Sequence, residues 1–383
     1  MNKHRRQRVG GRREFLRCGA GFGAAGLAFG AAGTGWWSLP AATGSSKKML
    51  VIFQRGGNDG INTVIPRGDA EYNPINRPTL FIPEKGAMDL GNGFAQLHPR
   101  MQPVMEIYDR KDLTGRPGPG NLAFLHRVGY AKPSYSHVES QGIWEEGGVR
   151  SGDLARGMFE RFLPGRQAGP ERGRGAGTVW ERTPGLPRGS ARWASDGPEE
   201  RAAYPQSPFG TRLRQAASLL KRTATQIARV DLDGWDTHAG QGGVDGPHGD
   251  LLAELAQGFQ ALHRHFERGW NDLVIVTMTE FGRTSRENGY RGTDHAEATV
   301  MLVAGGGVRG GVYNCDAATW KSGDLFSRRG RRLARRTDFR AVFAEIFTRH
   351  FGERADRLSQ MMPGFAEAAG DCPEEFAWLG LLG

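Results

Sequence analysis

The stretch Lys47-Lys48-Met49-Leu50-Val51-Ile52-Phe53 is a short, continuous apolar run that follows two charged residues. A run of this length without polar alternation is typical of a strand that is buried on both faces, as in a parallel sheet covered by helices. It leads into Gly56-Gly57-Asn58-Asp59-Gly60, a glycine-rich polar loop. The stretch therefore predicts an α/β protein whose polar side chains gather beyond the carboxyl ends of its strands.

Three more stretches read as strands, at residues 225–232, 272–278 and 299–304. A helix is predicted between the first two of them, from about Leu251 to Arg268. Its apolar side chains recur every three or four residues, at Leu252, Leu255, Phe259, Leu262 and Phe266. Strands that alternate with amphipathic helices predict a mostly parallel sheet with helices on both faces.

The composition excludes several classes of protein. The chain has 383 residues, enough for one large α/β domain or two ordinary ones, and its three cysteines exclude a disulfide scaffold or a cysteine-rich zinc ribbon. No window holds eighteen apolar residues free of glycine, so a multi-span membrane protein is excluded. The net charge is +10, but residues 1–17 carry seven Lys and Arg against one Glu, which leaves +4 for the rest. The charge therefore does not predict a nucleic-acid partner.

The N-terminus has the order of a signal peptide. Gly11-Arg12-Arg13-Glu14-Phe15-Leu16-Arg17 precedes a weakly apolar run, Cys18 to Trp37, and the small residues of Leu39-Pro40-Ala41-Ala42 follow it. Paired arginines before a glycine-diluted apolar run favour the twin-arginine pathway. The alternative is a basic tail with an interfacial helix. Because Cys18 stands at the start of the apolar run and not after it, no stable lipid anchor is expected.

These features divide the chain into three parts. Residues 1–45 are the predicted twin-arginine signal, residues 46–365 form the α/β domain, and residues 366–383 are a C-terminal tail. Residues 165–208 are rich in Gly, Arg and Pro and have no apolar period. They are too long for an ordinary loop, so they are either a flexible insertion or a degraded or frame-shifted segment. We expect a periplasmic or secreted protein whose export partner is the twin-arginine machinery.

Five polar clusters lie at or near predicted strand ends. They are Arg55 with Asn58-Asp59, Trp235-Asp236-Thr237-His238, Thr279-Glu280-Phe281-Gly282-Arg283-Thr284, Thr293-Asp294-His295, and Pro133-Ser134-Tyr135-Ser136-His137. Taken singly, each has a structural explanation, such as a turn, a cap or a surface cation. Because strand ends of a parallel sheet converge on one edge, we expect a shared polar site in which His295 and Asp236 lie within one coordination shell.

Carboxylate oxygens and imidazole nitrogens suit zinc or a similar divalent metal ion. The candidate metal ligands are Asp59, Asp236, His238, Glu280, Asp294 and His295. Ser136, at a predicted helix start, is the candidate nucleophile, since backbone amides there favour an anionic ester. Arg55 and Arg283 have the planar fork that binds non-bridging oxygens of such an ester.

Taken together, the motifs resemble the bacterial exported family called domain of unknown function 1501, which belongs by fold to the alkaline phosphatase and sulfatase superfamily. The resemblance runs from the signal to about Phe365, apart from residues 165–208. The motifs are Arg12–Leu16, Phe53–Thr63, Ser134–His137, Gly234–His238, Thr279–Thr284 and Gly292–His295. It implies an alkaline phosphatase-like fold.

The resemblance also implies roles for individual residues. His295 resembles the late metal-binding His of the superfamily, and Asp236 with His238 resembles its Asp/His pair. The sequence departs from the pattern at Glu280-Phe281, where the superfamily has Asp-His, and at Arg55, where it has a metal-binding Asp. The implied site therefore ranges from two metal ions to one or none.

Two functions compete on this basis. One is an exported, metal-assisted hydrolase of phosphate or sulfate esters, or a related transferase, which uses Ser136. The other is a non-catalytic exported binding or structural protein with a degenerate metal site. A nucleic-acid binder that uses Arg328 to Arg336 is disfavoured, because no aromatic platform accompanies these arginines.

The signal predicts that Arg12→Lys together with Arg13→Lys abolishes export, because the pathway recognises the arginine pair. Cell fractionation should find the double variant as uncleaved precursor in the cytoplasm. The control pair Arg5→Lys and Arg6→Lys should be exported normally. Normal export of the first variant would reject the twin-arginine interpretation.

Overall fold

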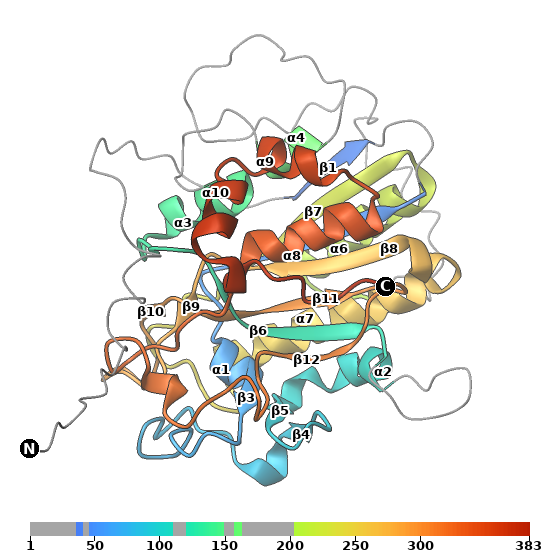
Figure 1. Cartoon of the computed structure of the whole chain (residues 1–383). Helices are drawn as coiled ribbons and strands as arrows, with labels where there is room; N and C mark the ends of the chain where they lie inside the picture. Colours follow the sequence, from blue (N-terminus) through green and yellow to red (C-terminus); the bar gives the residue numbers. More distant parts are fainter. Residues whose placement is uncertain (1–35, 41–45, 110–119, 149–156, 163–202) are drawn as a thin grey trace, which may run out of the picture.

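A computed structural model describes residues 36–40, 46–109, 120–148, 157–162 and 203–383 (Figure 1). Its central sheet has eight strands in the order β1-β7-β2-β8-β11-β6-β12, and β13 also pairs with β6. The strands are β1 (Trp36–Pro40), β2 (Lys48–Arg55), β6 (Leu122–Gly129), β7 (Thr225–Asp233), β8 (Leu273–Met278), β11 (Thr299–Ala304), β12 (Gly311–Tyr313) and β13 (Thr337–Asp338).

Two small sheets and a set of helices surround the central sheet. Strands β3 (Val64–Pro66), β5 (Ala95–Leu97) and β4 (Met88–Asp89) form one small sheet, and β9 (Gly282–Arg283) pairs with β10 (His295–Ala296) in the other. The α-helices are α1 (Gly60–Thr63), α2 (Met105–Tyr108), α3 (His137–Glu146), α4 (Met158–Phe162), α6 (Pro208–Arg222), α7 (Pro247–His265), α8 (Phe339–Glu345), α9 (Leu358–Met361) and α10 (Phe365–Asp371).

The four strands predicted from apolar runs are confirmed as β2, β7, β8 and β11, and the predicted helix is α7. Strand β2 lies between β7 and β8 and is parallel to both, so that Val51 is paired with Arg229 on one side and Val276 on the other. The apolar run Met49–Phe53 therefore lies in the middle one of three parallel strands.

The expected direction of β11 is wrong. It runs antiparallel to both of its neighbours, β8 and β6. Strand β1 is also antiparallel to β7, whereas β12 and β13 are parallel to β6, so the sheet is mixed. A parallel pair needs a crossover, usually a helix, that returns the chain to the opposite edge. The connection from β8 to β11 contains only loops and the β9–β10 pair, so the chain turns back at the same edge.

Strand β2 separates two apolar cores. Leu50 and Ile52 belong to the core that includes residues of α6 and α7, whereas Met49, Val51 and Phe53 belong to the core that includes residues of α3, α4 and α8. Successive side chains of a strand point to opposite faces, so this alternation requires a cover on each side. Figure 1 shows helices on both sides of the sheet, as the sequence predicted.

The ends of the two long helices follow from local sequence. Ser207 is the N-cap of α6, where its hydroxyl accepts a hydrogen bond from the Gly210 amide at 3.0 Å, and Pro208 occupies the first turn. Helix α7 also has a proline, Pro247, in its first turn, and its last turn is basic, which suits the negative end of the helix dipole.

Several predicted segments fall partly outside the described residues. The signal prediction concerns residues 1–45, of which only 36–40 are described, as edge strand β1. Of the predicted insertion, residues 203–208 are described and lead into α6. In the predicted C-terminal tail, Leu381 and Leu382 are buried, and Leu382 forms a β-bridge with Val308. Within the described ranges, no helix has the length and apolarity to cross a membrane.

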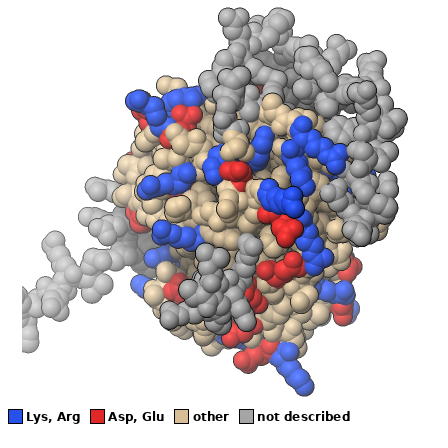
Figure 2. Space-filling view, turned by 90° about the vertical axis from the view of Figure 1, so that its right-hand side faces the viewer, with Lys and Arg blue, Asp and Glu red and all other residues tan. Residues whose placement is uncertain are grey.

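Charged side chains of both signs lie on the face shown in Figure 2. Lys and Arg predominate in the upper part of this view, and most of the Asp and Glu lie in its lower part.

The packing of α3 predicts a large loss of stability for Trp144→Ala. Trp144 is fully buried and stacks on Phe339, with ring centroids 4.2 Å apart. Removing a buried aromatic side chain costs about 3–5 kcal/mol of unfolding free energy. Urea denaturation should show this loss. The matched control Trp378→Ala removes a tryptophan that is 53% exposed and should cost less than about 1 kcal/mol. Equal losses would contradict this packing of α3.

Candidate functional site

Polar side chains from four separate segments meet at one edge of the sheet. Asp236 follows β7, Glu280 follows β8, and His137 begins α3 after β6. His295 lies in β10, just before β11. Because β11 is antiparallel to its neighbours, its start lies at the edge where the other strands end. His295 and Asp236 are therefore close, as expected, although the expected parallel arrangement of their strands is wrong.

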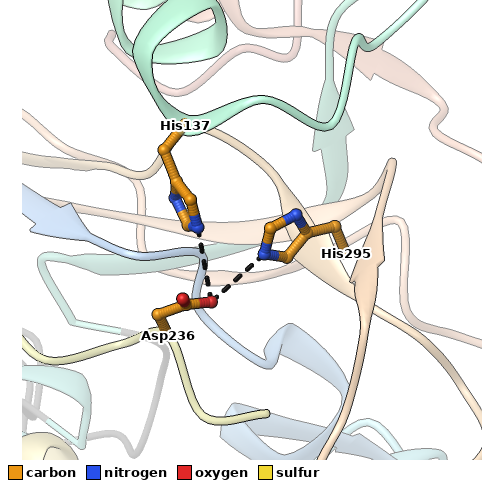
Figure 3. A group of neighbouring side chains, drawn as sticks. All are labelled: His137, Asp236 and His295. Atoms are coloured by element: carbon orange, nitrogen blue, oxygen red, sulfur yellow. Dashed lines mark hydrogen bonds and ion pairs between the residues drawn. The ribbon is translucent and has the colours of Figure 1, made fainter.

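Three histidine rings face one carboxylate oxygen. The Nε2 atoms of His295, His238 and His137 lie 3.1, 3.2 and 3.4 Å from Oδ1 of Asp236. The Nε2 atoms of His238 and His295 are 2.9 Å apart. Figure 3 shows His137 and His295 converging on Asp236 from different segments. We call His137, Asp236, His238 and His295 the histidine cluster.

Each histidine of the cluster directs its other ring nitrogen, Nδ1, at an oxygen that accepts hydrogen bonds. The Nδ1 contacts are His137 to Glu280 Oε1 at 2.8 Å, His295 to the Tyr135 carbonyl at 2.8 Å, and His238 to Asp294 Oδ1 at 3.4 Å. A carbonyl or an ionised carboxylate only accepts, so each Nδ1 carries the proton. In a neutral ring the Nε2 lone pair then faces Asp236.

The close contacts between the rings and the carboxylates shift the pKa values of His137 and Asp236. Burial alone lowers the pKa of His137, but its interactions with Asp236 and Glu280 outweigh burial and raise it from 6.5 to about 9. Partial burial alone raises the pKa of Asp236, but hydrogen bonds from His137, His295 and Arg283 hold it well below its usual value. Positive charge is therefore stabilised between the rings and the Asp236 carboxylate.

A divalent metal ion fits this donor set. One ligand atom from each of His137, Asp236 and His295 lies within 4.8 Å of the others. Metal-binding histidines usually donate their second ring N–H to a carboxylate or a carbonyl, as all three rings do here. The Nε2 atoms of His238 and His295, 2.9 Å apart, cannot both carry a proton, so at least one of these two rings presents a lone pair there.

Arg283 holds Asp236 in place. Its side chain is fully buried, and Nη2 donates to Asp236 Oδ1 at 2.6 Å. The same guanidinium donates to the carbonyls of Gly57, Thr293, Trp235 and Gly56. Arg283 was predicted to bind a substrate oxygen, but its donors are used within the protein.

Two glycines allow the close approach of these loops. A Cβ atom on Gly56, where φ is +123°, would lie 2.3 Å from the Asp236 amide nitrogen. A Cβ atom on Gly282 would lie 1.7 Å from the Ala298 carbonyl oxygen. Larger residues at these two positions would push apart the loops that carry the cluster.

Glu280 contacts His137 on the side of the ring that carries Nδ1. It is fully buried, and its Oε1 accepts hydrogen bonds from the Gly56 amide at 2.8 Å and from Gln141 Nε2 at 2.9 Å, in addition to the contact with His137. Arg55, which donates to Gln141, Glu145 and Asp231, forms the next layer. The structure thus places Glu280 against His137 and directs Arg55 away from the cluster.

The other predicted site residues lie around the cluster rather than in it. Asp59 is fully buried, forms an ion pair with Arg77 at 2.6 Å and accepts from Gln241. Asp294 contacts His238 and forms an ion pair with Arg331 at 2.9 Å. Ser136 is exposed at the N-cap of α3, and within the described residues its hydroxyl makes no hydrogen bond.

His137 is the cluster residue that the sequence analysis did not select as a ligand. The sequence placed it beside the candidate nucleophile Ser136 rather than among the metal ligands, and the preceding strand, β6, was not predicted. His126 and Arg127 interrupt the apolar run of β6, and Arg127 has a positive φ of 60°. The signal that could have identified His137 is a histidine placed directly after a serine at a predicted helix start.

Residues 194–329 match the model of a family described as Protein of unknown function (DUF1501). The matched range includes Asp236, His238 and His295 but ends short of α8 and begins after His137. No curated protein and no solved structure matches the chain. The match supports the resemblance to this family over residues 194–329, and the chemistry has to be argued from the site.

The raised pKa of His137 predicts a pH dependence of stability when no metal ion is bound. Its contribution is fully present below the unfolded-state pKa near 6.5 and is lost as the pH rises through about 9. In chelator-treated protein, the unfolding free energy from urea denaturation should therefore fall over this range. His137→Gln should flatten the curve. A slope that is the same in both proteins would contradict the predicted charge on His137.

Proposed function

We propose that this chain is an exported protein that binds one divalent metal ion in the histidine cluster and hydrolyses a phosphate or sulfate ester there. The observation that carries the proposal is the convergence of three Nε2 atoms on Asp236 Oδ1, at 3.1 to 3.4 Å. Imidazole and carboxylate are the ligands that zinc and similar ions take in hydrolytic sites.

The residues of the cluster have distinct parts in this proposal. His137, His238, His295 and Asp236 would hold the ion, and Arg283 orients Asp236. When bound, such an ion acts as a Lewis acid and lowers the pKa of a bound water. Glu280, the Tyr135 carbonyl and Asp294 fix the proton of each ring on Nδ1, which leaves Nε2 free to bind the ion.

The contacts favour one ion over two. Asp59 is paired with Arg77, and Glu280 Oε1 contacts Nδ1 of His137 rather than the Nε2 atom that faces Asp236. Ser136 remains the proposed nucleophile, because it adjoins His137 and its hydroxyl is exposed and makes no hydrogen bond among the described residues. Arg55, buried among acidic partners, has a structural part in this proposal.

One contact favours the alternative, a non-catalytic binding or structural protein. The Arg283 guanidinium donates to the same Asp236 oxygen that faces the three rings. A fixed cation at this oxygen weakens attraction for a second one. Ligating carboxylates are nevertheless often hydrogen-bonded from outside, which is the part we assign to Arg283.

The export route and the fold family belong to the same proposal. The arginine pair at Arg12 and Arg13, followed by a glycine-diluted apolar run, supports export to the periplasm or beyond through the twin-arginine machinery. The resemblance to the alkaline phosphatase and sulfatase superfamily supports the ester substrate. Folded export also fits a metal ion that is loaded before the protein crosses the membrane.

Elemental analysis of protein exported by its own signal tests the proposal. We expect about one divalent ion per chain, and loss of that ion in His295→Ala and in Asp236→Asn, because each removes a ligand. His263→Ala, which changes a histidine of α7 outside the cluster, should keep the ion. An ion content near zero in the unaltered protein would overturn the metal site.

Activity then separates the two candidate functions. Protein that contains the ion should hydrolyse 4-nitrophenyl phosphate or 4-nitrophenyl sulfate, and His295→Ala should lose this hydrolysis while keeping its fold by circular dichroism. If the ion is bound at the cluster and neither ester is hydrolysed, the non-catalytic alternative holds.

A further inference from the structure

Arg332 differs from its arginine neighbours in having no acidic partner. Within the described residues, its side chain makes no ion pair or hydrogen bond, and its Nε atom is buried without a partner. The surrounding arginines are mostly paired. Arg328 contacts Glu297, Arg331 contacts Asp294, and Arg335 contacts both Glu297 and Glu375. A half-buried guanidinium without an anion is costly unless a ligand completes it.

The Arg332 guanidinium stacks on the ring of Tyr135, whose backbone contacts the histidine cluster. Its central carbon lies 4.3 Å from the centre of the Tyr135 ring. The Tyr135 carbonyl is 2.8 Å from Nδ1 of His295, and His137 follows two residues later. Tyr135 has a positive φ of 59°, an unusual conformation for a tyrosine that is often found at functional sites. The stacking therefore links Arg332 to two members of the cluster.

The backbone around Arg332 is also fixed against the site. The amide and carbonyl of Arg328 are paired with those of Arg332, with N–O distances of 2.9 and 3.1 Å. The Ser285 amide donates to the Arg331 carbonyl at 2.9 Å, and Ser285 follows Arg283 by two residues. The turn from Arg328 to Arg332 is thus attached to the loop that carries Arg283.

The start of α3, which follows Tyr135 closely in the chain, adds positive potential. Ser136 provides no side-chain cap for this ten-residue helix, and in the part of the chain that is described the amides of Val138 and Glu139 donate no hydrogen bond. Uncapped amides at a helix start attract negative charge. Tyr135, on which Arg332 stacks, directly precedes the cap residue.

We propose that Arg332 is a substrate-binding residue that receives the non-bridging oxygens of a tetrahedral oxyanion ester, a phosphate or a sulfate, held at the histidine cluster. This inference rests on the proposed function and names the group that recognises its substrate. The guanidinium has a planar set of N–H donors that matches two oxygens of such a group, and stacking on Tyr135 sets its plane. No other described arginine combines an unpaired, half-buried guanidinium with contact to a residue of this site.

Binding of inorganic phosphate and of inorganic sulfate to the exported, metal-containing protein tests this inference. Isothermal titration calorimetry should show that Arg332→Gln weakens binding of the preferred anion about tenfold to a hundredfold, because a charge-assisted hydrogen bond is lost. The metal content should stay unchanged. Arg329→Gln, which alters an exposed arginine of the same turn, should leave the affinity unchanged.

Arg332→Lys provides a second measurement, since it keeps the positive charge and removes the planar set of guanidinium N–H donors. It should recover part of the affinity, and it decides the matter if Arg332→Gln does not fold. The anion whose affinity falls more in Arg332→Gln, phosphate or sulfate, is the one that Arg332 recognises. An unchanged affinity in folded Arg332→Gln, or failure of metal-containing protein to bind either anion, overturns the inference. An absence of metal in the unaltered protein overturns the proposed function instead.

Discussion

The buried guanidinium of Arg283 is the interaction on which the site depends. It donates to carbonyls of the loop after β2, at Gly56 and Gly57, to the loop after β7, at Trp235, and to Thr293 before β10, as well as to the Asp236 carboxylate. A buried cation without partners costs several kcal/mol, so these loops are stable only together. One side chain thereby fixes the position of Asp236 relative to the segment that carries His295.

The histidine cluster follows from this constraint and from the reversal of β11. Because β11 runs back from the edge where β2, β7 and β8 end, the segment before it brings His295 to Asp236. Packing of Trp144 on Phe339 anchors α3, whose first residue is His137. Each ring is also held through Nδ1. As a result, the Nε2 atoms of three histidines, each with a separate Nδ1 contact, face one oxygen of Asp236.

The sequence predicted the parts of the fold that are buried on both faces. Strands β2, β8 and β11 contain continuous apolar runs, and β7 has apolar residues between polar ones, whereas β6 contains His126 and Arg127 and was missed. A run of apolar residues does not encode direction, so the reversal of β11 could not be predicted. Asp236, His238 and His295 were selected from their places near strand ends. Asp59 was selected on the same grounds, but its pairing with Arg77 depends on a contact that sequence does not show.

The central claim is that the three rings and Asp236 are directed at a metal ion rather than only at one another. Anomalous diffraction at the zinc edge, from crystals of the full chain grown with Zn²⁺, tests it most directly. We predict one strong peak about 2.0–2.1 Å from the Nε2 atoms of His137 and His295 and near an Asp236 oxygen. Occupied zinc sites elsewhere, with no peak between these side chains, would contradict the claim.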